Sequence, residues 1–158
     1  MAQTGLTPRG VSFVHEAASK AYEDQMKWID ALDGKAGILM AGDGVIAGLI
    51  MTQGSVLTKS PTPIAVIVTV LLFASLGLAL LAFGTRRYEV APDIDQLLPQ
   101  MPHLDDDALR WIALKGYVNA LDVNESKVEQ KADLTFYSGM TLLGAIVIFG
   151  GYFIYFLV

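Results

Sequence analysis

Residues 63–84 read PIAVIVTVLLFASLGLALLAFG and contain no charged side chain. Residues 134–158 also contain none, and residues 36–57 contain a single one, Asp43. About 20 apolar residues in a helix cross a hydrocarbon core about 30 Å thick, so each of these stretches is long enough to span a bilayer. The sequence therefore predicts an all-α integral membrane protein with three transmembrane helices.

The composition excludes several other classes of protein. Only 17% of the 158 residues are charged, and the residues outside the spans are too few for two independent soluble domains. The absence of cysteine excludes disulfides, thiolate nucleophiles and cysteine metal sites. His15 and His103 share no metal-ligand spacing. The net charge of −5 argues against a nucleic-acid polymer as partner.

The apolar pattern divides the chain into four segments. They are an arm and amphipathic helix at 1–35, a transmembrane hairpin at 36–84 with spans at about 36–57 and 63–84, a connector and helix at 85–133, and a third span at 134–158. Asp105, Asp106 and Asp107 are typical of a helix N-cap and first turn. The helix before the first span and the helix before the third span both carry apolar stripes, so we expect them to form a helical bundle.

The basic residues predict the orientation in the membrane. Ten of the eleven lysines and arginines lie within 1–35 or 86–131, and only Lys59 lies in the short turn between the first two spans. Basic residues near span ends favour the cytoplasmic side. We therefore expect the N-terminus and the bundle in the cytoplasm and the C-terminus outside. Residues 1–10 lack the apolar core of a signal peptide, so the first span is expected to enter the membrane uncleaved.

Asp43 is the only charged residue within a predicted span. A carboxylate in hydrocarbon costs at least about 2.5–3.5 kcal/mol, so it is expected to face a partner, water or a protein cavity. In a homo-oligomer, several copies would form a ring that favours cations; the alternative is a structural hydrogen bond between helices. Gly44 and Gly48 form a GxxxG pair, which is typical of close helix contact in lipid.

Several polar residues near the membrane boundary are candidates for ligand binding. Asn124 and Gln25 interrupt apolar stripes, where an amide either fixes helix register or binds a ligand between helices. Trp28 offers an aromatic plane, and Lys35, Lys127 and Lys131 offer cations for a phosphate; the alternative is that they anchor the span ends. No nucleophile with a base, phosphate loop or metal cluster is evident, so we expect no enzyme, catalytic residue, metal or cofactor.

Residues 28–39 read WIDALDGKAGIL. This stretch resembles the bacterial Pycsar membrane effectors, the PycTM-type proteins, which enter the membrane through an Asp-x-Lys-Ala motif followed by a span rich in small residues. Here the motif is Asp33, Lys35 and Ala36. The layout of hairpin, basic connector and final helix with span is also similar.

The resemblance implies a role in anti-phage defence at the bacterial inner membrane. A pyrimidine nucleotide cyclase would make cCMP or cUMP, and the effector would respond by oligomerising and impairing the membrane. The residues outside the spans are too few for a β-roll cyclic-nucleotide domain, so a nucleotide site has to be helical. We expect Lys35, Lys127 and Lys131 to hold phosphate, Trp28 and Asn124 to hold the base, and Asp43, Gly44 and Gly48 to line or pack a pore.

Two other functions fit the same spans. One is a constitutive ion channel or holin-like pore with no small-molecule ligand, which would be toxic without a cyclase. The other is a membrane scaffold that anchors a partner through its cytoplasmic helices, in which neutralising Asp43 would leave function intact.

Overall fold

The structure is a computed structural model of the chain and describes residues 8–52, 62–84, 87–91 and 104–157. Over these residues it contains three α-helices and no strand: α1 (Pro8–Thr52), α3 (Thr62–Phe83) and α5 (Asp106–Leu157). Each helix contains a segment long and apolar enough to cross a membrane. The predicted fold class is therefore confirmed, and the protein is a multi-pass membrane protein. The polar turn with Lys59, and His103, lie outside the described residues.

The two long helices are too long for the bilayer alone. α1 has 45 residues and α5 has 52. At about 1.5 Å per residue, each is more than twice as long as a hydrocarbon core is thick. Both helices pass from one compact unit of the chain into the other. We call residues 1–29 with 86–128 the connector unit, and residues 30–85 with 129–158 the span unit.

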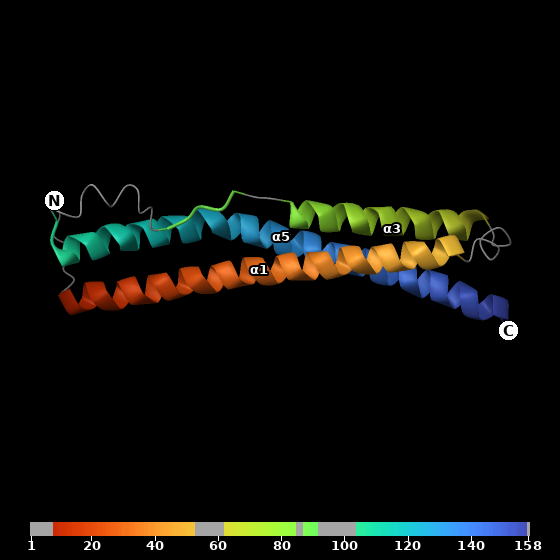
Figure 1. Cartoon of the computed structure of the whole chain (residues 1–158), viewed down its shortest axis with the longest axis horizontal. Coiled ribbons are helices and arrows are strands. Elements are labelled where there is room, and N and C mark those ends of the chain that lie inside the picture. Colours follow the sequence, from red (N-terminus) through yellow and green to blue (C-terminus); the bar gives the residue numbers. More distant parts are fainter. Residues whose placement is uncertain (1–7, 53–61, 85–86, 92–103, 158) are drawn as a thin grey trace. The chain divides into compact units, whose positions relative to one another are not determined.

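The connector unit is built from the first half of α1, the first half of α5 and the extended residues 87–91. The two helix halves run in the same direction (Figure 1). Tyr22, Ala91 and Ala120 form its buried core, and the Tyr117 ring packs 5.6 Å from the Tyr22 ring. The N–H of Ala108 donates to Asp105 Oδ1 over 2.8 Å, which confirms the predicted N-cap at the start of α5.

The span unit is built from α3 and the second halves of α1 and α5, and α3 runs opposite to the other two (Figure 1). Val68 and Leu72 of α3 form its core with Leu142 and Ala145 of α5. Many large apolar side chains on its outer surface are exposed. They include Ile38, Met51, Val70, Phe73, Leu81, Phe136, Val147 and Ile154. An apolar surface of this extent suits contact with lipid rather than water.

A small residue sets a close approach between two helices of the span unit. A Cβ placed on Gly42 would lie 3.2 Å from Leu142 Cδ2, which is tight, whereas one on Gly139 would lie at an ordinary contact distance of 3.8 Å from Leu39 Cδ2. A Cβ on Gly44 or Gly48 would meet no atom within 4 Å. Gly42 therefore lies at a tight contact between α1 and α5, and the predicted GxxxG pair is left on the surface.

This difference gives a test of the helix packing. A Gly42→Leu substitution drives a side chain into Leu142, and overpacking of this kind costs about 1–3 kcal/mol. Gly48→Leu is the matched control because a Cβ there meets no atom within 4 Å. We expect thermal unfolding of the detergent-solubilised protein to occur at lower temperature for Gly42→Leu and to be unchanged for Gly48→Leu. Equal melting temperatures for the two variants would contradict this packing.

Candidate functional site

Asp43 is buried inside the span unit and lies beside two serines, Ser75 and Ser138. It is 3% exposed, and its Oδ2 accepts a hydrogen bond from Ser75 Oγ over 3.0 Å. Ser75 Oγ also lies 3.1 Å from the Ser138 carbonyl oxygen, and Ser138 Oγ donates to the Ser75 carbonyl over 3.0 Å. The hydroxyl proton of Ser75 can serve only one acceptor at a time. Asp43, Ser75 and Ser138 thus form a polar cluster that joins all three helices.

The second carboxylate oxygen of Asp43 faces different surroundings. Oδ1 is buried and has no hydrogen-bond partner among the described residues. Asp43 also lines a groove of about 250 Å³ between α1 and α3. The other lining residues are Met40, Gly44, Ala47, Ile50, Met51, Thr69, Leu72, Phe73 and Leu76. The carboxylate therefore faces both a partner and a cavity, as its cost in hydrocarbon demands.

An ion pair joins α1 to α5 within the span unit. Lys131 Nζ lies 2.6 Å from Asp33 Oδ1, with the Lys131 side chain 2% exposed and that of Asp33 35% exposed. Ala36, one turn later on α1, is fully buried, whereas Lys35 is exposed. Two residues of the predicted family motif thus pack inward. Lys131, a predicted phosphate ligand, holds the Asp33 carboxylate.

Asn124 binds the backbone of the connector. It is fully buried; its Oδ1 accepts the N–H of Glu89 over 2.9 Å, and its Nδ2 donates to the Glu89 carbonyl over 3.0 Å. The Tyr22 hydroxyl donates to the same carbonyl over 3.4 Å and accepts the N–H of Ala91 over 3.3 Å. Residues 87–91 are therefore held to both helices of the connector unit by side chains.

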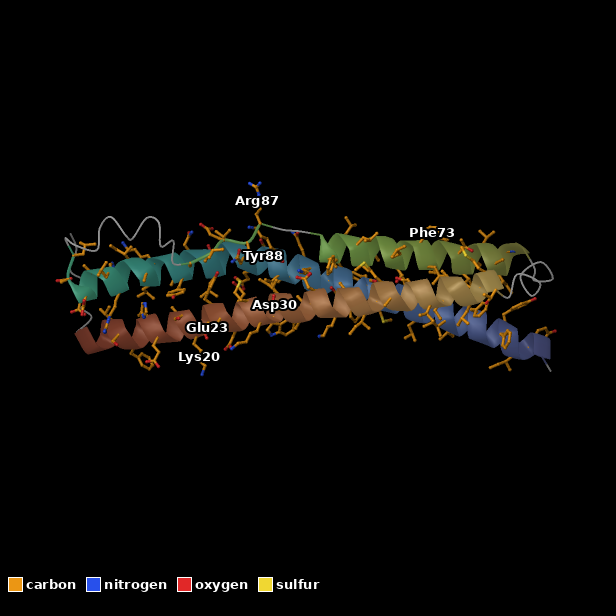
Figure 2. The ribbon with its side chains drawn as sticks, in the orientation of Figure 1. Lys20, Glu23, Asp30, Phe73, Arg87 and Tyr88 are labelled. Carbon is orange, nitrogen blue, oxygen red and sulfur yellow. The ribbon has the colours of Figure 1, made fainter. Side chains whose placement is uncertain are left out.

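Two further side chains complete what we call the connector clasp: Tyr22, Asn119, Asn124 and Lys127 holding residues 87–91. Lys127 Nζ donates to the Arg87 carbonyl over 2.7 Å, and Asn119 Nδ2 donates to Glu89 Oε1 over 3.1 Å. The side chain of Arg87 points away from the helices of this unit (Figure 2). The clasp thus holds the connector mainly by its backbone and leaves the Arg87 guanidinium exposed.

The predicted ligand residues divide between the two units. Asn124, Lys127 and Trp28 belong to the connector unit, where Trp28 is 57% exposed. Lys35 and Lys131 belong to the span unit. Gln25, the other amide within an apolar stripe, belongs to the connector unit, where its Nε2 donates to the Leu121 carbonyl over 3.2 Å and joins α1 to α5.

Several residues of these sites were not found from the sequence. They are Ser75 and Ser138 in the span unit, and Tyr22, Glu89 and Asn119 in the connector unit. Ser75 is the only hydroxyl-bearing residue in the second half of the apolar segment 63–84, which is a signal that such a residue has a polar partner. Tyr22 and Asn124 bind the backbone of Glu89 and Ala91, and these contacts leave no side-chain signal.

Comparison with known proteins gave one family. Residues 17–93 match the family model described as Pycsar effector protein domain. The match includes the Asp33, Lys35 and Ala36 motif, α3 and the connector residues of the clasp, and it ends before α5. Searches of curated proteins and of solved structures gave no match. Among the described residues, no group of three acidic or histidine side chains could hold a metal ion.

The ion pair predicts a measurable stability effect. Asp33→Ala leaves the Lys131 ammonium buried without this carboxylate, and we expect a loss of about 2 kcal/mol, the lower end for a broken buried pair, since Asp33 is a third exposed. Adding Lys131→Met should recover most of the loss because the buried charge is then removed. Unfolding in detergent measures both effects.

The exposed pair Asp24–Lys27, 3.3 Å apart on α1, is the matched control. Asp24→Ala should change stability by less than about 1 kcal/mol, because exposed pairs contribute little. A loss for Asp33→Ala no larger than that for Asp24→Ala would contradict a stabilising role for the buried pair.

Proposed function

Since the chain belongs to the Pycsar membrane-effector family, whose domain covers residues 17–93, it is a membrane effector of anti-phage defence, and we propose that cCMP or cUMP activates it to impair the inner membrane. The membership confirms the resemblance indicated by residues 28–39. The nucleotide would come from a pyrimidine nucleotide cyclase. We propose that the connector unit lies in the cytoplasm, where that product appears, as the distribution of lysine and arginine favours.

The observation that carries the ligand proposal is the pairing of Asn124 with Glu89. The Asn124 amide offers one acceptor and one donor, and the Glu89 backbone supplies their partners over 2.9 and 3.0 Å. Cytosine offers an amine donor beside a ring acceptor, and uracil offers a ring N–H donor beside a carbonyl acceptor. Rotating the amide by half a turn exchanges its donor and acceptor, so Asn124 can pair with either pyrimidine.

Lys127 supports the same proposal for the phosphate. It lies one helical turn after Asn124, and its ammonium donates to the neutral Arg87 carbonyl over 2.7 Å. A cyclic phosphate is a charged acceptor, and hydrogen bonds to charged acceptors are about twice as strong as neutral ones. The exposed face of Trp28 is proposed to stack on the base. Lys35 and Lys131 remain proposed phosphate residues, and Lys131 would have to exchange Asp33 for the phosphate.

In this proposal the connector and the nucleotide compete for Asn124 and Lys127. The clasped connector is the resting state, and the ligand binds the state in which residues 87–91 have left the clasp. A ligand that binds one of two states shifts the population toward that state. The connector follows α3 in the chain, so its release removes a restraint on the end of a span. The spans would then open a leak in a homo-oligomer, with Asp43, Gly44 and Gly48 lining or packing the pore.

Dye release from liposomes that contain the purified protein tests the proposal. Wild-type protein should release dye when cCMP or cUMP is added and stay closed with cAMP or cGMP. Asn124→Ala should abolish the response. Tyr22→Phe keeps the ring but removes the hydroxyl that holds Glu89 and Ala91. It therefore weakens the clasp without changing Asn124, the residue proposed to bind the base. It should shift the response to about fivefold lower nucleotide concentration, since a net hydrogen bond contributes about 1 kcal/mol.

Each other outcome has a defined meaning. Release without any nucleotide would favour a constitutive pore and overturn activation by a ligand. No release with either pyrimidine nucleotide would also overturn it. A Tyr22→Phe response at higher concentration than wild type would contradict competition between connector and ligand. The nucleotide concentration at which Tyr22→Phe releases dye tests this competition even if Asn124→Ala does not fold.

A further inference from the structure

Among the polar side-chain groups of the span unit that lack a hydrogen-bond partner within the described residues, two lie at the same depth along the helices. One is Oδ1 of the buried Asp43. The other is the hydroxyl of Tyr137, whose side chain is 57% exposed and packs its ring 5.7 Å from that of Phe136. Polar groups left unpaired in hydrocarbon cost several kcal/mol each. We propose that they pair between two copies of this chain, with Tyr137 of one copy entering the Asp43 groove of the next.

The two groups lie at the same depth along the helices. Tyr137 directly precedes Ser138, and Ser138 Oγ lies 3.3 Å from Ser75 Oγ, which in turn lies 3.0 Å from Asp43 Oδ2. All copies of one chain insert into a membrane with the same orientation. Tyr137 of a neighbouring copy therefore reaches the groove at the level of Asp43 without any vertical shift.

The groove also fits a tyrosine chemically. Except for Asp43 and Thr69, its lining is apolar, and Gly44 and Ala47 leave room beside the carboxylate. An aromatic ring with a polar tip matches an apolar wall with one polar group. The phenol can donate to a carboxylate or accept from a protonated carboxyl. A lipid acyl chain could fill the space but offers no hydrogen bond, which favours a second copy as the occupant.

The resulting assembly has a definite symmetry. The groove is formed by α1 and α3, whereas Tyr137 belongs to α5. Two different surfaces thus meet, so the contact is heterologous and repeats around a ring or along an open chain. This surface depends only on the span unit and is independent of any nucleotide.

Cysteine cross-linking in native membranes tests this contact, because the chain contains no cysteine. Gly44→Cys lines the groove, and a Cβ there meets no atom within 4 Å. Met140→Cys lies one turn from Tyr137 on an exposed part of α5. We expect a short bis-maleimide to link the doubly substituted chain into a ladder of dimers and larger species. When chains that carry only Gly44→Cys are mixed with chains that carry only Met140→Cys, the only cross-linked product should be a dimer with one chain of each kind.

The hydrogen bond itself is tested in the double-cysteine background. Tyr137→Phe should lower the cross-linked fraction about threefold, the factor expected for an average hydrogen bond between membrane helices. Tyr155→Phe, another exposed tyrosine of α5, is the matched control and should leave the fraction unchanged. Three outcomes would overturn the proposal. They are the absence of a ladder, cross-linked dimers formed between chains that carry only Gly44→Cys, and equal effects of Tyr137→Phe and Tyr155→Phe on the cross-linked fraction.

Discussion

A carboxylate within apolar helices has to be hydrogen-bonded, and the structure of the span unit follows from how Asp43 meets that constraint. The Ser75 hydroxyl reaches Asp43 over 3.0 Å only because the three helices lie close together. Gly42 permits this approach, since a larger side chain there would meet Leu142. The polar cluster and this small residue therefore depend on each other. The cluster satisfies only one oxygen of Asp43; the other is buried without a partner among the described residues, and Asp43 also lines the groove.

Each of the two units is held together internally by contacts of a different chemistry. In the span unit, Lys131 and Asp33 form a buried ion pair, and breaking such a pair leaves a buried charge. In the connector unit, the clasp consists mainly of hydrogen bonds between side chains and the backbone of residues 87–91. These bonds can be exchanged for those of a ligand that offers the same donors and acceptors. A switch is therefore more readily built from the clasp than from the ion pair.

Much of the fold could be predicted because it rests on local patterns. Uncharged runs such as 63–84 determine the spans, and Asp105 marks the start of α5 through its capping chemistry. The family could be inferred because the Asp33, Lys35 and Ala36 motif lies within a few residues of sequence.

The contacts between helices could not be predicted in the same way. Whether Gly42 or Gly44 faces another helix depends on the rotation of α1, which the GxxxG spacing does not determine. Ser75 and Ser138 meet Asp43 only once three separate segments are aligned in depth. The partner of Asn124 is the backbone of Glu89, and a backbone amide carries no residue-specific signal. The sequence therefore indicated Asn124 but not the connector that it holds.

Hydrogen exchange at the amides of Glu89 and Ala91 tests the central claim most directly. Their N–H groups donate to Asn124 and Tyr22 in the clasp, so displacement of the connector must release them. In lipid nanodiscs saturated with cCMP or cUMP, we expect both amides to exchange faster than without nucleotide. The Ala108 amide, bonded to Asp105, should stay unchanged. Unchanged or slower exchange at Glu89 and Ala91 with nucleotide bound would contradict displacement of the connector by the ligand.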